Sequence, residues 1–477
     1  SYGGTEFDTP NLDRFAAQAT RFTQHYSGSL PCMPARHDIL VGALDFLWRP
    51  WGSIELWEEP VTAGLRRSGV ATKLVTDHPH LFEVGGENYH TDFTAWDYQR
   101  GHESDLWRTR PDASWIGAPL FGRRHMPYDN SRGWFRSEKD FPGPRVMSEA
   151  VRWVREESAA HDSWLLFVDE FDPHEPFDTP EPYASMYDDS WDGPQHLVWP
   201  PYTVGAVEKG VLTERDARQV RAQYGSKLTM IDAWFGRLLD ALSLDDTVVI
   251  VCTDHGHYLG EKDIFGKPGC PIYEPLGHTP LLLSVPGVEA GTCDALTTNV
   301  DIHATLCDLF AVPPGYGAHG HSLLPLLRGD ATAVRDWALA GIWGREVHLI
   351  ADHAKYVRAP DGENFPLSMW SNRWSTMPIH SAPDFKLPRP DDRAYLDRMP
   401  GSTVPVIRQP FQPGDLLPFW AYSDFAAGTL AFDLGEDPSE ERNLADDKLG
   451  AQLSEMLHAA LNEVDAPDDQ FARLGFR

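Results

Sequence analysis

Apolar residues recur along this chain with spacings that alternate between those of helices and those of buried strands. Thr9–Ala19 has a threonine cap, a proline in the first turn and an apolar stripe, which predicts a helix. A long helix is predicted from Thr213, with Asp216 as its capping-box partner, to about Ser243. Short apolar runs with polar ends predict strands at Gly69–Asp77, Ser163–Phe171, Asp245–Gly256 and His278–Gly287, and a helix at Val300–Phe310.

The alternation of strands and helices continues to about residue 335. It predicts an α/β fold in which helices sandwich a mostly parallel sheet. Beyond that point Glu346–Pro360 has the pattern of a hairpin, and a last helix is predicted around Leu449–Val464. We therefore predict a larger domain over residues 1–335 and a smaller α+β domain over residues 336–477.

Composition indicates a globular protein whose partners are small. The 477 residues are 42% hydrophobic, enough for a large core. The formal charge of −30 is spread along the chain, which argues against nucleic acid and anionic membrane surfaces as partners. No apolar run approaches the ~20 residues of a membrane span. Five scattered cysteines do not make a disulfide framework, and no signal peptide is visible. We expect a cytoplasmic protein, with periplasmic or secreted location left open.

The segment "CMPAR" places a cysteine, Cys32, four residues before an arginine, Arg36, with a proline between them. It resembles the C-x-P-x-R signature of sulfatases, in which the cysteine is oxidised to Cα-formylglycine. If a helix begins near Pro34, Cys32 lies beside the free N–H groups of its first turn, where an oxyanion binds well. Arg36, one turn further on, would then hold the modified side chain. The plainer alternative is a half-buried free cysteine.

A second segment, "TDHGHYLGEKDIFGK", follows the strand predicted at Asp245–Gly256. It resembles the metal-binding segment of sulfatases, which implies that Asp254 and His255 bind a divalent cation and that Lys267 contacts the sulfate. The expected cation is calcium, with manganese as the alternative. Read alone, Asp-His-Gly would be a capped turn at a strand end. His257 is predicted to be a surface residue.

Two further segments supply histidines. "FDPHEPF" resembles the H-x-P segment of the family, so His174 is a candidate proton donor to the leaving group. "TDHPHLF" stands where many sulfatases have G-K-W-H. It lacks the lysine but offers His78 or His80 for binding the sulfate. For each histidine, a structural role in a turn or loop remains the alternative.

These motifs occur in family order together with "TPNLDRFA", "PLGHTPLLLSVPG", "HGHSLLPLLRGD" and "FDLGEDPSEERNLA". The chain therefore resembles a sulfatase-type member of the alkaline phosphatase superfamily, which implies an alkaline-phosphatase-like fold with the catalytic domain over residues 1–335. Family members carry an aspartate pair at the end of a first strand, shortly before a Tyr-Gly like Tyr2-Gly3. We expect this sequence to begin just after that strand.

The resemblance implies hydrolysis of a sulfated small molecule or carbohydrate, after maturation by the formylglycine-generating enzyme. It leaves the oligomeric state open. The rival within the superfamily is a phosphonate monoester or phosphodiester hydrolase, which shares the modified cysteine, the Asp-His pair and the later lysine. A rival from another class is a catalytically silent protein that binds sulfated ligands.

Aromatic residues gather in two stretches, Trp96–Trp134 and Trp370–Trp420. They can stack on sugar or aryl rings, although such residues more often serve packing. Residues 95–144 are also rich in Arg, Gly and Pro, and this composition predicts long surface loops that could cover a site.

Overall fold

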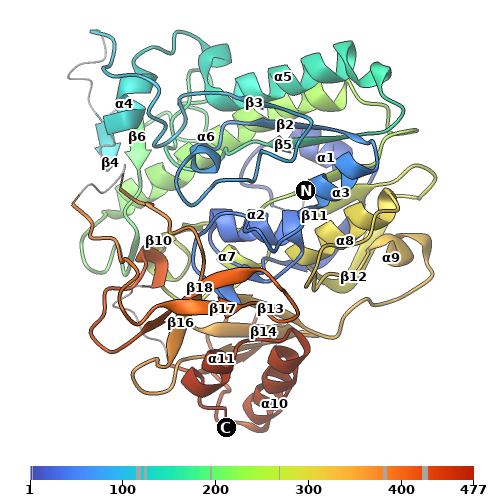
Figure 1. The fold of residues 1–477 in the computed structure, drawn as a ribbon. Coiled ribbons are helices and arrows are strands. Elements are labelled where there is room, and N and C mark those ends of the chain that lie inside the picture. The colour runs from blue at the N-terminus through green and yellow to red at the C-terminus, as the bar shows by residue number, and fades with distance from the viewer. Residues whose placement is uncertain are drawn as a thin grey trace.

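A computed structural model places most of the chain in a layered α/β arrangement (Figure 1). It describes residues 2, 4–113, 120–122, 126–193, 196–267, 269–379, 384–421 and 428–476. Gly3 of the Tyr2-Gly3 pair lies outside these ranges.

Two sheets form the centre of the larger domain. The first has the strand order β12-β1-β11-β8 and the second β3-β2-β5. β1 pairs parallel to β12, and β2 pairs parallel to both β3 and β5, whereas β11 runs antiparallel to β1 and β8. The strands are β1 (Thr20–Tyr26), β2 (Ala71–Thr76), β3 (Ala95–Tyr98), β5 (Trp164–Asp169), β8 (Val249–Cys252), β11 (Leu281–Ser284) and β12 (Gly291–Thr298).

Helices cover both faces of the β3-β2-β5 sheet, and the alternation of β5 shows why. Leu165 and Phe167 pack into the core that contains α2 and α3, whereas Leu166 and Val168 pack against α5 and α6. Successive side chains of a strand point to opposite faces, so both faces of this apolar strand are covered by helices, although most of its residues are only partly buried. The helices concerned are α2 (Cys32–Val41), α3 (Val61–Arg67), α5 (Pro142–Glu156) and α6 (Glu214–Leu239).

The predicted helices of this domain are present. α1 (Pro10–Ala16) packs on α6, whose first turn is capped reciprocally by Thr213 and Asp216. α8 (Asn299–Leu309) packs against α2. α2 is buried along its whole length, and its contact with α8 therefore fixes the position of its first residue, Cys32.

The C-terminal elements gather at the end of the molecule opposite α5 (Figure 1). The predicted hairpin is β14 (Val347–Ala351) and β15 (Ala354–Arg358), in the sheet β13-β14-β15-β19. The predicted last helix is α10 (Lys448–Glu463). The exact domain boundary stays a prediction. The other elements here are β13 (Ala338–Gly341), β16 (Leu367–Trp370), β17 (Tyr395–Arg398), β18 (Pro405–Phe411), η6 (Phe419–Ala421), β19 (Leu430–Asp433) and α11 (Asp468–Arg473).

The prediction of long surface loops over residues 95–144 was only partly right in the described part of this stretch. This stretch opens with β3, which extends the parallel sheet through β2, and α5 begins at Pro142. Its other described elements are β4 (Leu120–Gly122), α4 (Met126–Arg132) and η3 (Glu138–Asp140). They are too short to give a periodic pattern in the sequence. Residues 114–119 and 123–125 lie outside the described ranges.

The remaining elements are short, and in the sequence most of them fall between the strands of the central sheets. They are η1 (Asp45–Leu47), η2 (Pro79–Phe82), η4 (Ser158–Ala160), β6 (His196–Trp199), β7 (Thr203–Val204), β9 (Tyr258–Leu259), η5 (Glu261–Asp263), β10 (Ile264–Gly266), α7 (Glu274–Gly277) and α9 (Leu324–Arg328). Within the described ranges, no helix has the length and apolar character needed to cross a membrane.

The packing of α10 gives a test of the fold. Leu457 is fully buried in the core between α10 and the C-terminal sheet, whereas its neighbour Met456 is 38% exposed. We expect Leu457→Ala to lower the free energy of unfolding by about 2–5 kcal/mol through lost burial and the cavity left behind. Met456→Ala is the matched control, with an expected change within about 0.5 kcal/mol. Urea denaturation measures both, and equal effects would contradict this packing.

Candidate active site

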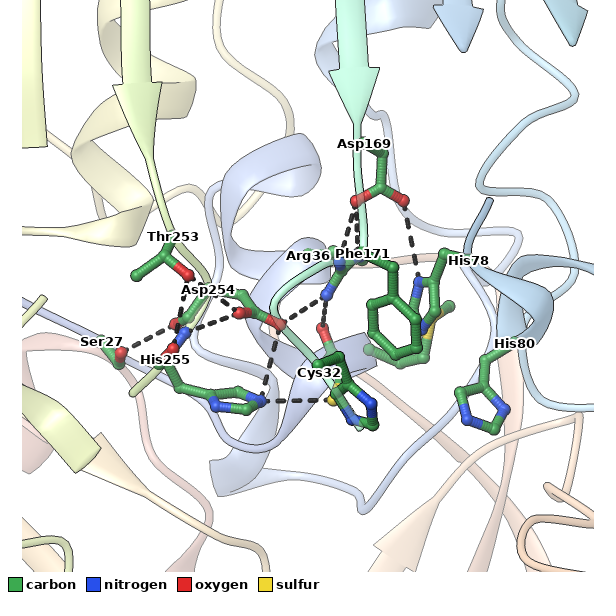
Figure 2. Close-up of polar contacts among 12 residues, drawn as sticks. Ser27, Cys32, Arg36, His78, His80, Asp169, Phe171, Thr253, Asp254 and His255 are labelled. Atoms are coloured by element: carbon green, nitrogen blue, oxygen red, sulfur yellow. Dashed lines mark hydrogen bonds and ion pairs between the residues drawn. The ribbon is translucent and has the colours of Figure 1, made fainter. Parts of the chain in front are cut away.

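Several strands of the two sheets deliver polar side chains to one place (Figure 2). β8 ends at Cys252 and leads to Asp254 and His255, and β5 ends at Asp169. The carboxyl ends of strands in α/β sheets are where such folds bind their ligands. The cluster confirms the predicted position of the Asp-His pair and adds Asp169 to it.

Cys32 is the first residue of α2, after Pro31 at the cap position, close to the predicted helix start. Its Sγ lies 3.2 Å from Nε2 of His255. Burial raises the pKa of the Cys32 thiol to about 12, since the nearby cation of Lys267 offsets only part of that effect. The unmodified thiol is therefore protonated near neutral pH and is a poor nucleophile.

Arg36 lies one turn further along α2 and is held between two strand ends. Its Nε donates to Oδ1 of Asp169 at 3.0 Å, and its Nη1 lies 2.5 Å from Oδ2 of Asp254. Nη1 also donates to the carbonyl oxygen of Cys32 at 3.1 Å. Burial opposes the charges of this group, yet Arg36 holds the pKa of Asp169 well below its usual range, as His255 and Arg36 do for Asp254. All three groups are therefore ionised, and Arg36 binds the backbone of Cys32 rather than its thiol.

His255 faces Cys32 with a nitrogen that can accept. Its Nδ1 lies 2.8 Å from the carbonyl oxygen of Gly256, to which it donates, so Nε2 carries the lone pair. Burial lowers the pKa of His255 to about 4, and the imidazole is therefore neutral. Nε2 also lies 3.5 Å from Oδ2 of Asp254.

The donors of Cys32, Asp254 and His255 all lie within 4.8 Å of one another. An ionised carboxylate and a neutral imidazole nitrogen are ordinary ligands of divalent cations, so the residues present fit the expected metal. Arg36 would share the Asp254 carboxylate with such an ion. Three donors are fewer than the six to eight oxygens that calcium takes, so further ligands are needed.

A second group of metal-type donors in the described part of the chain is His37, Asp45 and Glu58. Here Arg49 already supplies the positive charge. Its Nε donates to Oδ1 of Asp45 at 2.6 Å, and its Nη2 lies 3.0 Å from both oxygens of Glu58. This group is therefore a buried ion-pair network rather than a metal site.

Lys267 and His174 lie side by side in this site. Nζ of Lys267 is 2.7 Å from Nε2 of His174, and Nδ1 of His174 donates to the carbonyl oxygen of Glu175. Burial and the Lys267 charge hold the pKa of His174 well below its usual range. Burial opposes the ammonium of Lys267, but the carboxylate of Glu175 raises its pKa. In this pair Lys267 is therefore the cation and His174 the neutral acceptor.

Glu175 is a fully buried carboxylate on which four side chains converge. It accepts from the hydroxyl of Tyr202 at 2.6 Å and from Nε2 of His257 at 2.7 Å. Its other oxygen lies 3.1 Å from Nδ1 of His174 and 3.5 Å from Nζ of Lys267. The prediction that His257 is a surface residue was wrong, because this contact holds it in the interior.

His78 and His80 lie beside Phe171 at the side of the site away from Asp254 and His255 (Figure 2). Burial and Arg36 lower the pKa of His78 to about 3. The Nδ1 of His78 lies 3.7 Å from Oδ2 of Asp169, a contact longer than a hydrogen bond. His80 lies 2.9 Å from Glu83 and 3.1 Å from Glu103. These carboxylates outweigh burial and raise its pKa to about 10. The two histidines therefore differ in charge, and which of them binds the sulfate stays a prediction.

Sequence reasoning missed three acidic residues of this site. Asp169 ends a predicted strand, and the rule that located Asp254 applies equally to it. Glu175 follows His174 directly in the sequence, so its place beside the site could be predicted, but its burial could not. Glu103 lies in an irregular segment with a left-handed backbone, φ 41°, where no periodic pattern exists.

The comparisons with known proteins agree with this geometry. A sequence model of the sulfatase family matches residues 1–312. A choline-sulfatase of Rhizobium meliloti is 26% identical over 360 residues, which are 67% of this chain and 67% of that protein. An arylsulfatase K of Gallus gallus is 24% identical over 415 residues, 76% of this chain and 72% of the relative.

Solved structures share the fold. A phosphonate monoester hydrolase of Agrobacterium radiobacter superposes with a TM-score of 0.62 at 19% identity, covering 97% of this chain and 92% of its own. An α/β fold of the alkaline-phosphatase type is thereby established. Because the family model spans more than half of its length, the chain belongs to the sulfatase family, a family of sulfuric ester hydrolases.

The Glu175 network predicts a pH effect. Glu175→Gln removes the carboxylate that raises the pKa of Lys267, so that pKa falls. An ammonium loses its proton as the pH rises through its pKa, and we expect the alkaline limb of the kcat profile to move to lower pH by on the order of one unit. The measurement is the rate of sulfate release from an aryl sulfate against pH.

The control is Glu181→Gln, an exposed glutamate in the same segment that contacts Ser185. Its profile is expected to match the parent protein. An unmoved alkaline limb in Glu175→Gln would show that Glu175 does not set the protonation of the group that limits the rate at high pH.

Proposed function

We propose that this chain hydrolyses sulfate monoesters with a formylglycine nucleophile made from Cys32, next to a divalent cation bound by Asp254 and His255. The observation that carries the proposal is the position of Cys32. It starts a buried helix, 3.2 Å from the accepting nitrogen of His255, with Arg36 paired to Asp254 one turn away. Membership of the sulfatase family supports it.

The proposed groups supply what the unmodified chain lacks. Hydrated formylglycine supplies a hydroxyl that attacks sulfur and a second hydroxyl whose proton loss releases the sulfate, and the cation supplies positive charge for the anionic oxygens. The formylglycine-generating enzyme is the proposed maturation partner. Calcium is the proposed ion and manganese the alternative, since Asp254 offers a hard oxygen and His255 an imidazole.

The chain's own residues do the remaining work. Lys267 is a cation that can contact the sulfate and give a proton to the departing alcohol oxygen, and neutral His174 holds its Nζ at 2.7 Å. Arg36 keeps Asp254 ionised and the first turn of α2 in place. The free N–H groups of that turn and the two cations stabilise added negative charge without reorganisation.

The proposed substrate class is a sulfated small molecule or carbohydrate. The choline-sulfatase and arylsulfatase relatives name different alcohols, so their likeness to this chain does not choose between them. The Asp-His pair keeps phosphonate monoester hydrolysis as the second candidate, a chemistry named for a structure of the same fold. Sulfate and phosphate release from matched aryl esters separates the two.

The modification of Cys32 tests the proposal directly. After co-expression with a formylglycine-generating enzyme, mass spectrometry of the peptide that contains Cys32 should show the mass loss of a thiol converted to an aldehyde. The matured protein should release sulfate from para-nitrophenyl sulfate. Cys32→Ala should lower kcat by on the order of 10³-fold or more, because the nucleophile is gone.

Cys293→Ala is the control, because Cys293 is a half-buried cysteine on β12 that pairs with Phe22 of β1 rather than with a residue of the site. It should keep the parent activity. An unmodified thiol together with no hydrolysis would support the silent, ligand-binding alternative, and faster release of phosphate than of sulfate would support the phosphonate hydrolase.

A further inference from the structure

The segment "FDLGEDPSEERNLA" takes no part in the site described above, yet one of its residues reaches the larger domain. Glu440 lies in this segment after β19 and is 4% exposed. Its backbone is left-handed, with φ 55°, a conformation that a residue with a side chain keeps only where the surrounding contacts hold it. A buried carboxylate of this kind requires partners for both of its oxygens.

Both carboxylate oxygens of Glu440 accept hydrogen bonds. Oε2 accepts from the backbone N–H of Glu274, the first residue of α7, at 2.7 Å. Oε1 accepts from Nζ of Lys355 on β15 at 2.9 Å. The same Nζ donates to Oε1 of Glu274 at 2.6 Å and to the carbonyl oxygen of Ile272 at 3.2 Å. The ammonium of Lys355, which is 1% exposed, thus uses all three of its hydrogens here.

These residues form a buried ion network. Burial opposes the charge of Glu274, but Lys355 and His278 bring its pKa down to about 2. Burial also opposes the ammonium of Lys355, and the carboxylates of Glu274 and Glu440 raise its pKa. Removing the charge of one member therefore leaves another charge without its partner in the interior.

A second contact joins Glu440 to η5. Nζ of Lys262 donates to the carbonyl oxygen of Glu440 at 2.9 Å and lies 3.2 Å from Oε1 of Glu441. The same ammonium lies over the ring of Tyr273, 4.9 Å from the ring centroid. Glu440 is therefore bound to both ends of the segment that runs from Lys262 to Glu274.

This segment carries Lys267 between its two tethered ends. Its end at α7 also supports the metal-type donors, because the carbonyl oxygen of Leu276 accepts from the backbone N–H of Gly256 at 2.8 Å. Gly256 follows His255 directly. The tether at Glu440 thus bears on the segment of Lys267 and on the backbone beside the Asp-His pair.

We propose that Glu440 is a positioning residue for the hydrolysis, which fixes the segment of Lys267 so that its Nζ stays beside His174 and can give a proton to the departing oxygen. Glu440 acts through the backbone of the larger domain rather than on the substrate. The part played by Lys267 rests on the proposed sulfatase function, whereas the tethering of its segment does not.

Glu440→Gln tests the tether without catalysis. Glutamine has one acceptor oxygen where the carboxylate has two, so its NH2 group faces either Lys355 or the N–H of Glu274, and that contact is lost. Hydrogen exchange of the full, unmodified chain, measured by mass spectrometry, should become about tenfold faster in peptides from residues 262–277. Peptides from β2 and β5 should exchange as in the parent.

The matched control is Glu436→Gln, because Glu436 belongs to the same segment but has a 73% exposed side chain. Its exchange should match that of the parent throughout. Unchanged exchange of residues 262–277 in Glu440→Gln would overturn the tether. An equal rise in β2 and β5 would also overturn it, because that result marks a general loss of stability.

Kinetics of the matured protein test the link to the reaction through the leaving group. Phenol is a weaker acid than para-nitrophenol, so its departure depends more strongly on proton donation by Lys267. Glu440→Gln should lower kcat for phenyl sulfate on the order of tenfold, and kcat for para-nitrophenyl sulfate by less than about threefold. Glu436→Gln should leave both rates unchanged.

Equal losses for the two esters would overturn the positioning role, because a merely structural defect lowers both rates alike. If Glu440→Gln shows the local rise in exchange but the matured parent releases no sulfate from either ester, the tether stands. The proposed function is then disproved, and with it the link of the tether to the reaction.

Discussion

The guanidinium of Arg36 is the contact on which the rest of this site depends. It is buried between Asp169 at the end of β5 and Asp254 after β8, and it donates to the backbone of Cys32. One side chain thus joins the ends of strands from two separate sheets to the first residue of α2. Removing one partner of such a buried pair leaves an unpaired charge, at a cost of about 3–5 kcal/mol. The positions of Cys32 and of the Asp-His pair are therefore coupled through Arg36.

The charge balance of the site favours the proposal that a metal ion binds there. Each cation described here already has carboxylate partners: Arg36 has Asp169 and Asp254, Lys267 has Glu175, and His80 has Glu83 and Glu103. The chain as a whole carries −30. An anionic ester therefore finds little net attraction in these side chains alone. A dication at Asp254 and His255 would supply the positive charge. The side-chain cations that are already paired with carboxylates would orient the ester and donate protons.

Regular elements with long periodic patterns were predictable from the sequence, and irregular ones were not. The capping box at Thr213 and the apolar stripe of α6 located that helix to within a few residues, and the β14–β15 hairpin was found in the same way. β3 and α4 were missed because four to seven residues carry no measurable period. β11 was predicted as a strand of a mostly parallel sheet, yet it runs antiparallel, since strand direction follows from tertiary connections that a local pattern does not contain.

The candidate site followed the same division. Five of the predicted residues belong to motifs that are recognised by the spacing of their residues, and the structure gathers these residues at the strand ends. They are Cys32, Arg36, Asp254, His174 and Lys267. Their catalytic roles stay predictions. Burial decided what the sequence left open: it makes His78 neutral, keeps His174 neutral beside Lys267, and encloses Glu175 and His257. The partners that set these charge states come from distant parts of the chain, and proximity of that kind has no local pattern.

The proposed reaction requires that residue 32, once modified, lies beside a dication bound by Asp254 and His255. The most direct measurement is a crystal structure of the matured protein grown with calcium, with anomalous scattering from a manganese-exchanged crystal to locate the ion. We expect one ion in contact with Asp254, His255 and the modified residue 32. An ion bound instead by His37, Asp45 and Glu58, or none at the Asp-His pair, would contradict it.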